Sequence, residues 1–267
     1  MGLDHPASSD TAEAACIPFT ETGIAPVGVQ LRLSSLAFNG DVLLRNLDLT
    51  LPPGRITCLL GPSGVGKTSI LRLIAGFLPL PSGSFLKTSD GQPLTGRLSY
   101  MDQRDLLLPW ARVRDNLLIG ARLRGETPDL ARADTLLSRV GLEKWRDARP
   151  DALSGGMRQR VALARTLMED TPVVLMDEPF SALDAITKYH LQALAARLLA
   201  NRTVLLITHD PMEALRIGHE IHVLSGSPAQ LSGPIRPAGK IPRDPTNDEL
   251  KTHYSAIMSA LAVSVEG

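Results

Sequence analysis

Short apolar runs alternate with helically spaced apolar residues along most of the chain. Alternating apolar and polar positions predict half-buried strands, whereas a continuous apolar run bounded by turn signals predicts a buried strand. On these grounds we expect strands over residues 27–33, 43–51, 56–60, 97–101, 172–176, 203–207 and 221–224. Helical spacing predicts helices over residues 69–77, 185–199, 211–217 and 248–261. Residues 1–26 are small, polar and without pattern, which predicts a flexible N-terminal extension.

The pattern changes over residues 106–153. Apolar residues there recur at helical spacing, as in Leu117, Leu136 and Leu137, which predicts a helical insert. Strand–helix alternation then resumes, and such alternation favours a mostly parallel sheet with helices on both faces. The predicted fold class is therefore α/β. Pro-rich residues 234–245 predict a linker before the last helix.

Composition excludes several classes of protein. The 267 residues include 28 basic and 28 acidic ones, and this balance argues against a dedicated nucleic-acid-binding protein, which would carry a basic face. No apolar run reaches the roughly 18 residues that a membrane-spanning helix needs. The two cysteines, Cys16 and Cys58, are too few for a disulfide scaffold, and we expect Cys58 in a buried strand. His219 and His222 fit no metal-ligand spacing, so we expect structural roles for them.

The strand predicted over 56–60 runs into a sequence that fits the phosphate-loop pattern G-x-x-x-x-G-K-[ST], namely Gly61-Pro62-Ser63-Gly64-Val65-Gly66-Lys67-Thr68. Glycines let the backbone wrap around a phosphate, and the start of the following helix, with Ser69, attracts an anion. Lys67 would reach the β- and γ-phosphates, and the Thr68 hydroxyl would bind Mg²⁺. The loop thus predicts a nucleotide site; the alternative, a chance Gly-rich turn, is disfavoured by the strand before it and the helix after it.

Two carboxylates, Asp177 and Glu178, end the apolar run that begins at Val173. Because the carboxyl ends of parallel strands line the ligand crevice, Asp177 would lie near the Mg²⁺ held by Thr68. Glu178 could face the γ-phosphate and polarise a water. A metal, a lysine and a water-orienting carboxylate suffice for phosphoryl transfer, which depends mainly on positioning and charge neutralisation. The alternative is a solvated strand end with two acidic residues.

A second glycine motif precedes the helical run 161–168. Ser154 is a natural N-cap, and Gly155 and Gly156 expose the backbone at the helix start, which makes a second potential anion site. A single bound triphosphate would not need two such anion sites from one chain. Two chains that share nucleotides would use both sites. An ordinary capped helix is the alternative.

The stretch Leu153-Ser154-Gly155-Gly156-Met157-Arg158-Gln159 resembles the signature motif of ABC-transporter ATP-binding subunits. Other motifs follow in that family's order. Gln103 stands at the Q-loop glutamine, residues 181–184 resemble the D-loop, and Thr208-His209-Asp210 resembles the switch-histidine loop. Phe38 lies 23 positions before Gly61, where the family places an aromatic under the adenine; a lone phenylalanine is otherwise a common core residue.

This resemblance spans roughly residues 27–235 and implies a P-loop NTPase, RecA-like parallel sheet core. An antiparallel β subdomain and a helical signature subdomain at about 105–157 would be attached to it. Residues 236–267 would form a linker and a C-terminal helix. Membership implies ATP and Mg²⁺ as ligands.

Residue roles also follow from the resemblance. Glu178 would be the general base, His209 would contact the γ-phosphate, and Lys67 and Gln103 would complete the catalytic set. Gln103 would also touch Mg²⁺, beside Thr68 and Asp177. A second copy of the chain would present Ser154, Gly155 and Gly156 to the same ATP in a head-to-tail dimer.

The resemblance further implies a bacterial importer with a separate integral-membrane permease and, indirectly, a solute-binding protein. The chain would then lie peripherally on the cytoplasmic face of the inner membrane. Leu107-Leu108-Pro109-Trp110 followed by residues 113–116 resembles nitrate/sulfonate/taurine-type importers, and thiamine-precursor importers have a similar pattern. A groove near residues 103–110 would hold a short permease helix.

Two other functions compete with transport. A soluble ABC ATPase of repair or translation predicts two cassettes, a long coiled-coil insert or a basic surface, and the sequence has none of them. A scaffold that binds ATP without hydrolysis would not need Lys67, Asp177, Glu178 and His209, which are all present.

Overall fold

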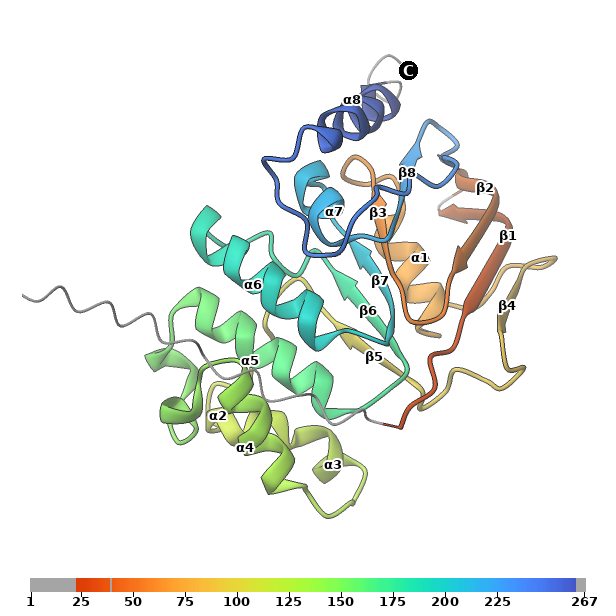
Figure 1. The fold of residues 1–267 in the computed structure, drawn as a ribbon. Coiled ribbons are helices and arrows are strands. Elements are labelled where there is room, and N and C mark those ends of the chain that lie inside the picture. The colour runs from red at the N-terminus through yellow and green to blue at the C-terminus, as the bar shows by residue number, and fades with distance from the viewer. Residues whose placement is uncertain (1–22, 39, 263–267) are drawn as a thin grey trace, which may run out of the picture.

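The structure is a computed structural model that describes residues 23–38 and 40–262 (Figure 1). Expectations for Cys16 and for most of the N-terminal extension lie outside these residues. The strands are β1 (Val29–Phe38), β2 (Asp41–Leu51), β3 (Ile56–Leu60), β4 (Phe85–Thr88), β5 (Leu98–Met101), β6 (Val173–Asp177), β7 (Thr203–Ile207), β8 (Glu220–Ser225) and β9 (Gln230–Leu231). The helices are α1 (Lys67–Ile74), α2 (Val113–Leu117), α3 (Ile119–Leu123), α4 (Leu130–Arg139), α5 (Gly155–Met168), α6 (Ala185–Leu198), α7 (Pro211–Ile217) and α8 (Glu249–Ala262).

The central sheet has the strand order β5-β6-β7-β3-β8-β9, and its neighbours pair in parallel from β5 to β8. Only β9 pairs antiparallel, with β8. The predicted parallel sheet and α/β class are confirmed. Strands β3, β6 and β7 are buried along their whole length, as expected for parallel strands that are covered on both faces.

Alternate residues of these strands feed two separate hydrophobic cores, because successive side chains point to opposite faces of a sheet. Ile56, Cys58 and Leu60 of β3 pack with α5, α6 and α7, whereas Leu59 packs with α1 and the second sheet (Figure 1). Cys58 is fully buried, as predicted. The layers therefore follow from the pattern of each strand.

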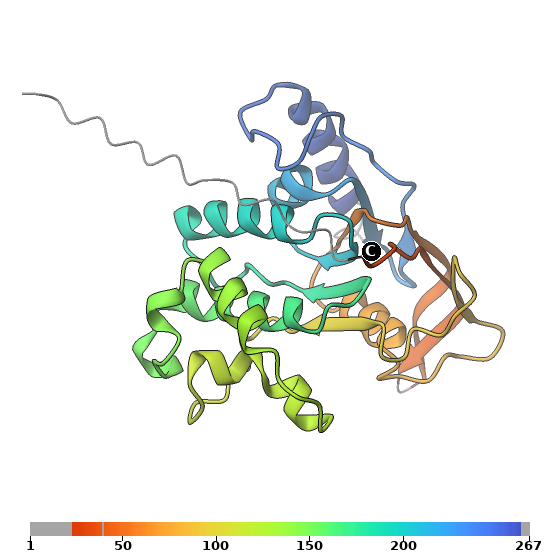
Figure 2. The same cartoon turned by 60° about the horizontal axis from the view of Figure 1, so that its bottom comes forward.

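The second sheet is antiparallel, with the order β2-β1-β4. The strand predicted over 27–33 begins two residues later and continues to Phe38 in β1. It was underestimated because Ser34 and Ser35 interrupt the apolar alternation, yet pairing with β2 continues past them to a register shift at Leu36/Ala37. Figure 2 shows this sheet and helices α2–α4 at opposite ends of the molecule.

Helix α1 begins and ends earlier than the predicted range 69–77. Gly66, with φ of 106°, precedes its first residue, and Gly76 follows its end in the left-handed conformation. The Phe77 N–H donates to the Arg72 carbonyl and the Gly76 N–H to that of Leu73, which is the Schellman arrangement that ends a helix. The early start places Lys67 at the very beginning of the helix.

Helices α2 and α4 pack against α5 in the predicted helical insert. Helix α5 begins directly after Ser154, whose hydroxyl accepts a hydrogen bond from the Met157 N–H at 3.3 Å, so the predicted N-cap is confirmed. Apolar side chains from Val113, Leu137 and Val161 join the core on the α5 side of the sheet. The insert is thus continuous with the main core.

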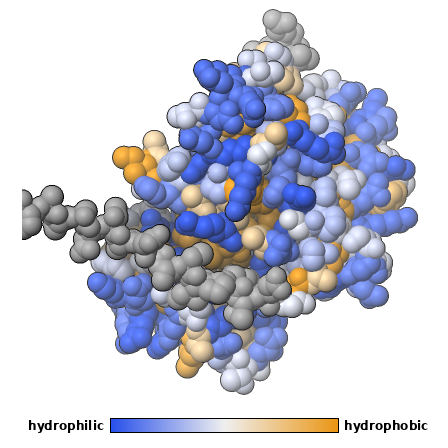
Figure 3. Space-filling view, in the orientation of Figure 1, coloured by the Kyte–Doolittle hydropathy of each residue, from blue (hydrophilic) through white to orange (hydrophobic). Residues whose placement is uncertain are grey.

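The predicted linker lies against the body of the protein. The Arg243 guanidinium donates hydrogen bonds to the carbonyls of Leu215 and Gly218 at the end of α7, and to Ala238 and Pro237 within the linker. Helix α8 then packs on α7 and β8. None of the described helices is long and apolar enough to cross a lipid bilayer. The face in Figure 3 is largely hydrophilic, with apolar side chains exposed in small patches.

Candidate nucleotide site

Three loops leave the parallel sheet at the carboxyl ends of neighbouring strands. The loop 61–66 follows β3, Glu178 follows β6, and residues 208–210 follow β7. Ligands bind at this edge in open α/β sheets. The strand order β6-β7-β3 therefore brings segments more than a hundred residues apart in sequence to one place.

The loop 61–66 folds closely onto the end of β8. A Cβ atom on Gly61 would lie 2.5 Å from the Leu224 carbonyl oxygen, so only glycine fits there. The buried Lys67 ammonium turns back into the loop and donates to the carbonyls of Gly61 at 2.7 Å and Pro62 at 2.9 Å. Burial lowers the pKa of Lys67, and the nearby carboxylates of Glu178 and Asp177 oppose this shift. The Lys67 ammonium is thus held by two backbone carbonyls of the loop.

The Asp177 carboxylate lies beside this loop, and each of its oxygens accepts one side-chain hydrogen bond. The Thr68 hydroxyl donates to Oδ1 at 3.3 Å, and the Tyr100 hydroxyl donates to Oδ2 at 3.3 Å. Burial raises the pKa of Asp177, and the two hydrogen bonds oppose that rise. Burial and the charge of Asp177 also raise the pKa of Tyr100, so its hydroxyl stays a donor at neutral pH.

A second polar cluster forms around Glu178. Its Oε2 lies 2.9 Å from Nδ1 of His209, a contact that requires a proton on Nδ1 because an ionised carboxylate only accepts. The Gln103 amide nitrogen lies 3.5 Å from the same oxygen and 3.3 Å from the Ser181 hydroxyl. The structure thus brings together Gln103, Glu178 and His209, three residues to which the family resemblance assigns catalytic roles.

The glycine motif before α5 is not joined to the phosphate loop by hydrogen bonds within the described part of the chain. Among the described residues, no hydrogen bond or ion pair connects Ser154, Gly155 or Gly156 with residues 61–69. Gly156 instead packs against α6, where a Cβ atom would approach Thr187 Cγ2 to 2.4 Å. Phe38 ends β1 and pairs with Asp41 in β2; its side chain lies outside what the structure describes.

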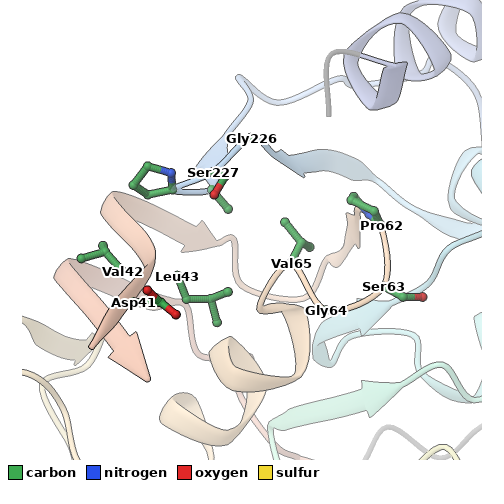
Figure 4. Close-up of a pocket in the computed structure, with 11 residues that line it drawn as sticks. Asp41, Val42, Leu43, Pro62, Ser63, Gly64, Val65, Gly226 and Ser227 are labelled. Carbon is green, nitrogen blue, oxygen red and sulfur yellow. The ribbon is translucent and has the colours of Figure 1, made fainter. Parts of the chain in front are cut away.

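A hollow of about 720 Å³ adjoins the loop 61–66. Its walls come from the start of β2, the loop itself and the turn after β8, and Figure 4 shows Leu43, Val65 and Ser227 around it. The lining residues are Asp41, Val42, Leu43, Pro62, Ser63, Gly64, Val65, Gly226, Ser227, Pro228 and Ala229. This volume lies within the range of small-ligand pockets.

The structure adds polar residues that pattern reading missed. No sequence motif marks Tyr100, which the pattern places only within a strand, or Lys188, which pairs with Asp210 beside His209. A buried tyrosine hydroxyl signals that a partner exists, but the sequence does not say which one. Both contacts join elements far apart in the chain, which no local motif encodes.

The oxygen donors at the site fit Mg²⁺, which prefers hard oxygen ligands and takes only one or two from protein. Thr68 and Asp177 would supply them. Among the described residues, no group of three or more His, Cys, Asp or Glu side chains could hold a metal ion. A glycine-rich phosphate loop on a parallel sheet, next to an acidic strand end, defines a P-loop nucleotide-binding protein.

Comparison with known proteins identifies the family. The ABC transporter family model matches residues 44–181, so the chain belongs to the ABC transporter ATP-binding family. An uncharacterized ABC transporter ATP-binding protein of Haemophilus influenzae is 41% identical over 240 residues, covering 87% of this chain and 98% of that protein.

Two relatives carry more specific names. The aliphatic sulfonates import ATP-binding protein SsuB 1 of Rhodococcus jostii is 44% identical over 201 residues, covering 74% of this chain and 80% of that protein. The taurine import ATP-binding protein TauB of Roseobacter denitrificans is 37% identical over 240 residues, covering 85% and 88%. The resemblance to the nitrate/sulfonate/taurine group is confirmed. As a member of this family, the chain binds ATP and is an ATPase.

Proposed function

We propose that the protein is the ATP-hydrolysing subunit of an importer for sulfonates, taurine or similar small solutes. The observation that carries this proposal is the cluster of Lys67, Asp177, Glu178 and His209 at one sheet edge, in a chain related to sulfonate and taurine import subunits. Import of a thiamine precursor or nitrate is the neighbouring alternative within the same group.

Hydrolysis would use the cluster around Glu178. Its carboxylate is the base that polarises the attacking water, and His209 fixes its orientation and contacts the γ-phosphate. Gln103 approaches the same carboxylate and supplies a further polar contact for water or metal. Lys67 neutralises charge on the β- and γ-phosphates, since its ammonium is already held within the loop.

The remaining ligand contacts are assigned by position. Thr68 and Asp177 hold Mg²⁺, which neutralises phosphate charge when bound. The loop 61–66 and Ser69 bind the phosphates. The hollow beside the loop takes the nucleoside, and Phe38, which pairs with Asp41 of its wall, is assigned to the adenine by the family resemblance.

A second copy of the chain would complete the site. Ser154, Gly155 and Gly156 stand at the N-terminus of the 14-residue helix α5, whose unpaired N–H groups suit an anion. Because no hydrogen bond or ion pair joins them to residues 61–69 of their own chain within the described part, we assign them to the nucleotide held by the partner subunit.

A separate permease would dock on the segment after β5, with the chain on the cytoplasmic face of the inner membrane. The backbone of Leu106 is left-handed, with φ of 46°. Leu106 is exposed and Trp110 is 71% exposed, so this segment presents apolar side chains to solvent. Arg165 of α5 fixes the segment by donating to the carbonyls of Asp105 and Leu106. A solute-binding protein would act indirectly, through the permease.

The second candidate function is a soluble ABC ATPase outside transport. The names of the relatives and the exposed apolar segment after β5 favour transport. Reconstitution with a permease of this importer group, followed by uptake of taurine, an alkanesulfonate, nitrate and a thiamine precursor into vesicles, separates the two: ATP-dependent uptake of any of them supports import, and no uptake of any of them with ATPase activity intact favours the soluble function.

The catalytic assignment is tested with Glu178→Gln. The amide keeps the size of the side chain but cannot accept a proton, so steady-state phosphate release should fall by at least about a hundredfold. Binding of a fluorescent ATP analogue should stay within a factor of two to three of the parent protein. Lys67→Ala is the matched variant and should instead lose nucleotide affinity. Turnover at the parent rate in Glu178→Gln would require another base.

A further inference from the structure

Tyr100 lies outside the motifs of the site, in β5, the edge strand of the parallel sheet. It stands opposite Leu175 of β6, two positions before Asp177. Its half-buried ring packs on the α1 side of the sheet and meets the Phe77 ring at a centroid distance of 5.5 Å and an angle of 60°. Strand pairing and ring packing together fix where its hydroxyl points.

The hydroxyl points at Asp177. It donates to Oδ2, while Thr68 donates to Oδ1, each at 3.3 Å. The terminal torsion of an aspartate is broad, so its rotamer preference alone does not fix the plane of the carboxylate. One donor on each oxygen does fix that plane. Asp177 is only 8% exposed, so little water is available to replace either donor.

The two donors differ in what metal binding does to them. Thr68 is itself a proposed ligand of Mg²⁺, so its geometry must follow the metal. Tyr100 lies on β5, whereas Asp177 lies on β6, and Tyr100 makes no proposed contact with metal or nucleotide. Its hydrogen bond can therefore persist in both states, as outer-shell partners of metal-binding carboxylates do.

We propose that Tyr100 is a positioning residue that holds the Asp177 carboxylate in the orientation that binds the divalent cation of the nucleotide complex. The inference rests on the proposed function, because it takes Asp177 as a metal ligand. It adds a residue of β5 itself to a site that otherwise uses only Gln103 from the segment after that strand.

The test is Tyr100→Phe, which removes one oxygen and keeps the ring that packs on Phe77. Mn²⁺ binding to the ADP complex of the full chain is measured by electron paramagnetic resonance. We expect the affinity for Mn²⁺ to fall about tenfold, which is the lower end of the loss seen when an outer-shell partner of a metal ligand is substituted. ADP affinity in EDTA should be unchanged, which also reports that the variant is folded. Half-maximal ATPase activity should require correspondingly more Mg²⁺.

Tyr254→Phe is the matched control, since it removes a hydroxyl from an exposed ring on α8. It should bind Mn²⁺ like the parent protein. Parent-like Mn²⁺ affinity in Tyr100→Phe, together with weakened binding in Asp177→Asn, overturns the role of Tyr100 and leaves the proposed function standing. Unchanged Mn²⁺ affinity in Asp177→Asn overturns both.

Discussion

At the scale of single residues, Glu178 occupies a backbone conformation that few non-glycine residues adopt, with φ of 46°. Such a conformation costs about 1–3 kcal/mol unless its surroundings enforce it. Its N–H donates to the Ile207 carbonyl at 3.0 Å, and its own carbonyl accepts from the Ser181 N–H at 3.2 Å. The turn is thereby fixed from both sides, and the carboxylate faces His209.

His219 gives the folded state a pH dependence. Its Nδ1 accepts a hydrogen bond from the Ile56 N–H at 3.0 Å, which only the neutral ring can do. Burial, with the charge of Arg55, lowers the pKa of His219. The stabilisation is therefore complete above the ordinary histidine pKa of about 6.5 and is lost as the pH falls below it, at a limiting slope of about 1.4 kcal/mol per pH unit. Urea unfolding at pH 7.5 and 5.5 measures the loss.

His219→Asn is the control for this effect. The asparagine oxygen can accept from Ile56 but does not titrate, so the difference in unfolding free energy between the two pH values should shrink. An equal difference in both proteins would place the pH dependence elsewhere.

At the scale of elements, helices α6 and α7 are joined by a buried ionic network. Lys188 of α6 pairs with Asp210 at 2.7 Å and with Glu213 of α7 at 3.0 Å. Gln192 donates to Glu213 at 3.1 Å, and Glu213 is only 2% exposed. Helix α7 starts next to His209, and α6 starts next to the loop 181–184. The network therefore fixes the loop that carries His209 relative to the loop 181–184.

Lys188→Met should destabilise the protein by about 3 kcal/mol, because it leaves the Glu213 carboxylate buried without a countercharge. Guanidinium unfolding at pH 7.5 measures this change. The double variant Lys188→Met/Glu213→Gln should recover most of it, since Glu213 is then no longer a buried charge without its partner. Lys251→Met removes an exposed lysine paired with Asp248 and should change stability by less than about 1 kcal/mol. Equal losses in the single and double variants would contradict the argument.

Some elements follow from the local sequence, and others depend on pairing with distant parts of the chain. Three elements have the predicted bounds. Two of them, strands 56–60 and 203–207, are continuous largely apolar runs. The third, helix 211–217, begins after a capping residue that is followed by proline. The phosphate loop is fixed by local chemistry and was predicted as well. Strand β1 was predicted too short, because its continuation depends on pairing with β2. Tyr100 and Lys188 act through partners on other elements, so no local pattern marks them.

At the scale of the whole molecule, the proposed site needs two copies of the chain. Glu178→Gln retains ATP in the proposed mechanism, so ATP with Mg²⁺ should convert it from monomer to dimer in size-exclusion chromatography with light scattering. Adding Ser154→Arg to this variant places a long side chain at the proposed shared nucleotide and should prevent the conversion. ATP affinity of the monomer should be unaffected, because Ser154 makes no hydrogen bond with its own loop 61–69 among the described residues. Dimer formation by the double variant would place the interface elsewhere.

Asp170 ties the helical insert to the parallel sheet. Arg132 of α4 and Arg202, just before β7, both bind its carboxylate at 2.7 Å, immediately beyond the end of α5. Ser154, which caps the opposite end of α5, lies roughly 24 Å from Asp170 at 1.5 Å of rise per residue. The two arginines thus anchor the end of α5 remote from Ser154 to both α4 and the start of β7, so the placement of Ser154 depends on how the helical insert is seated against the sheet.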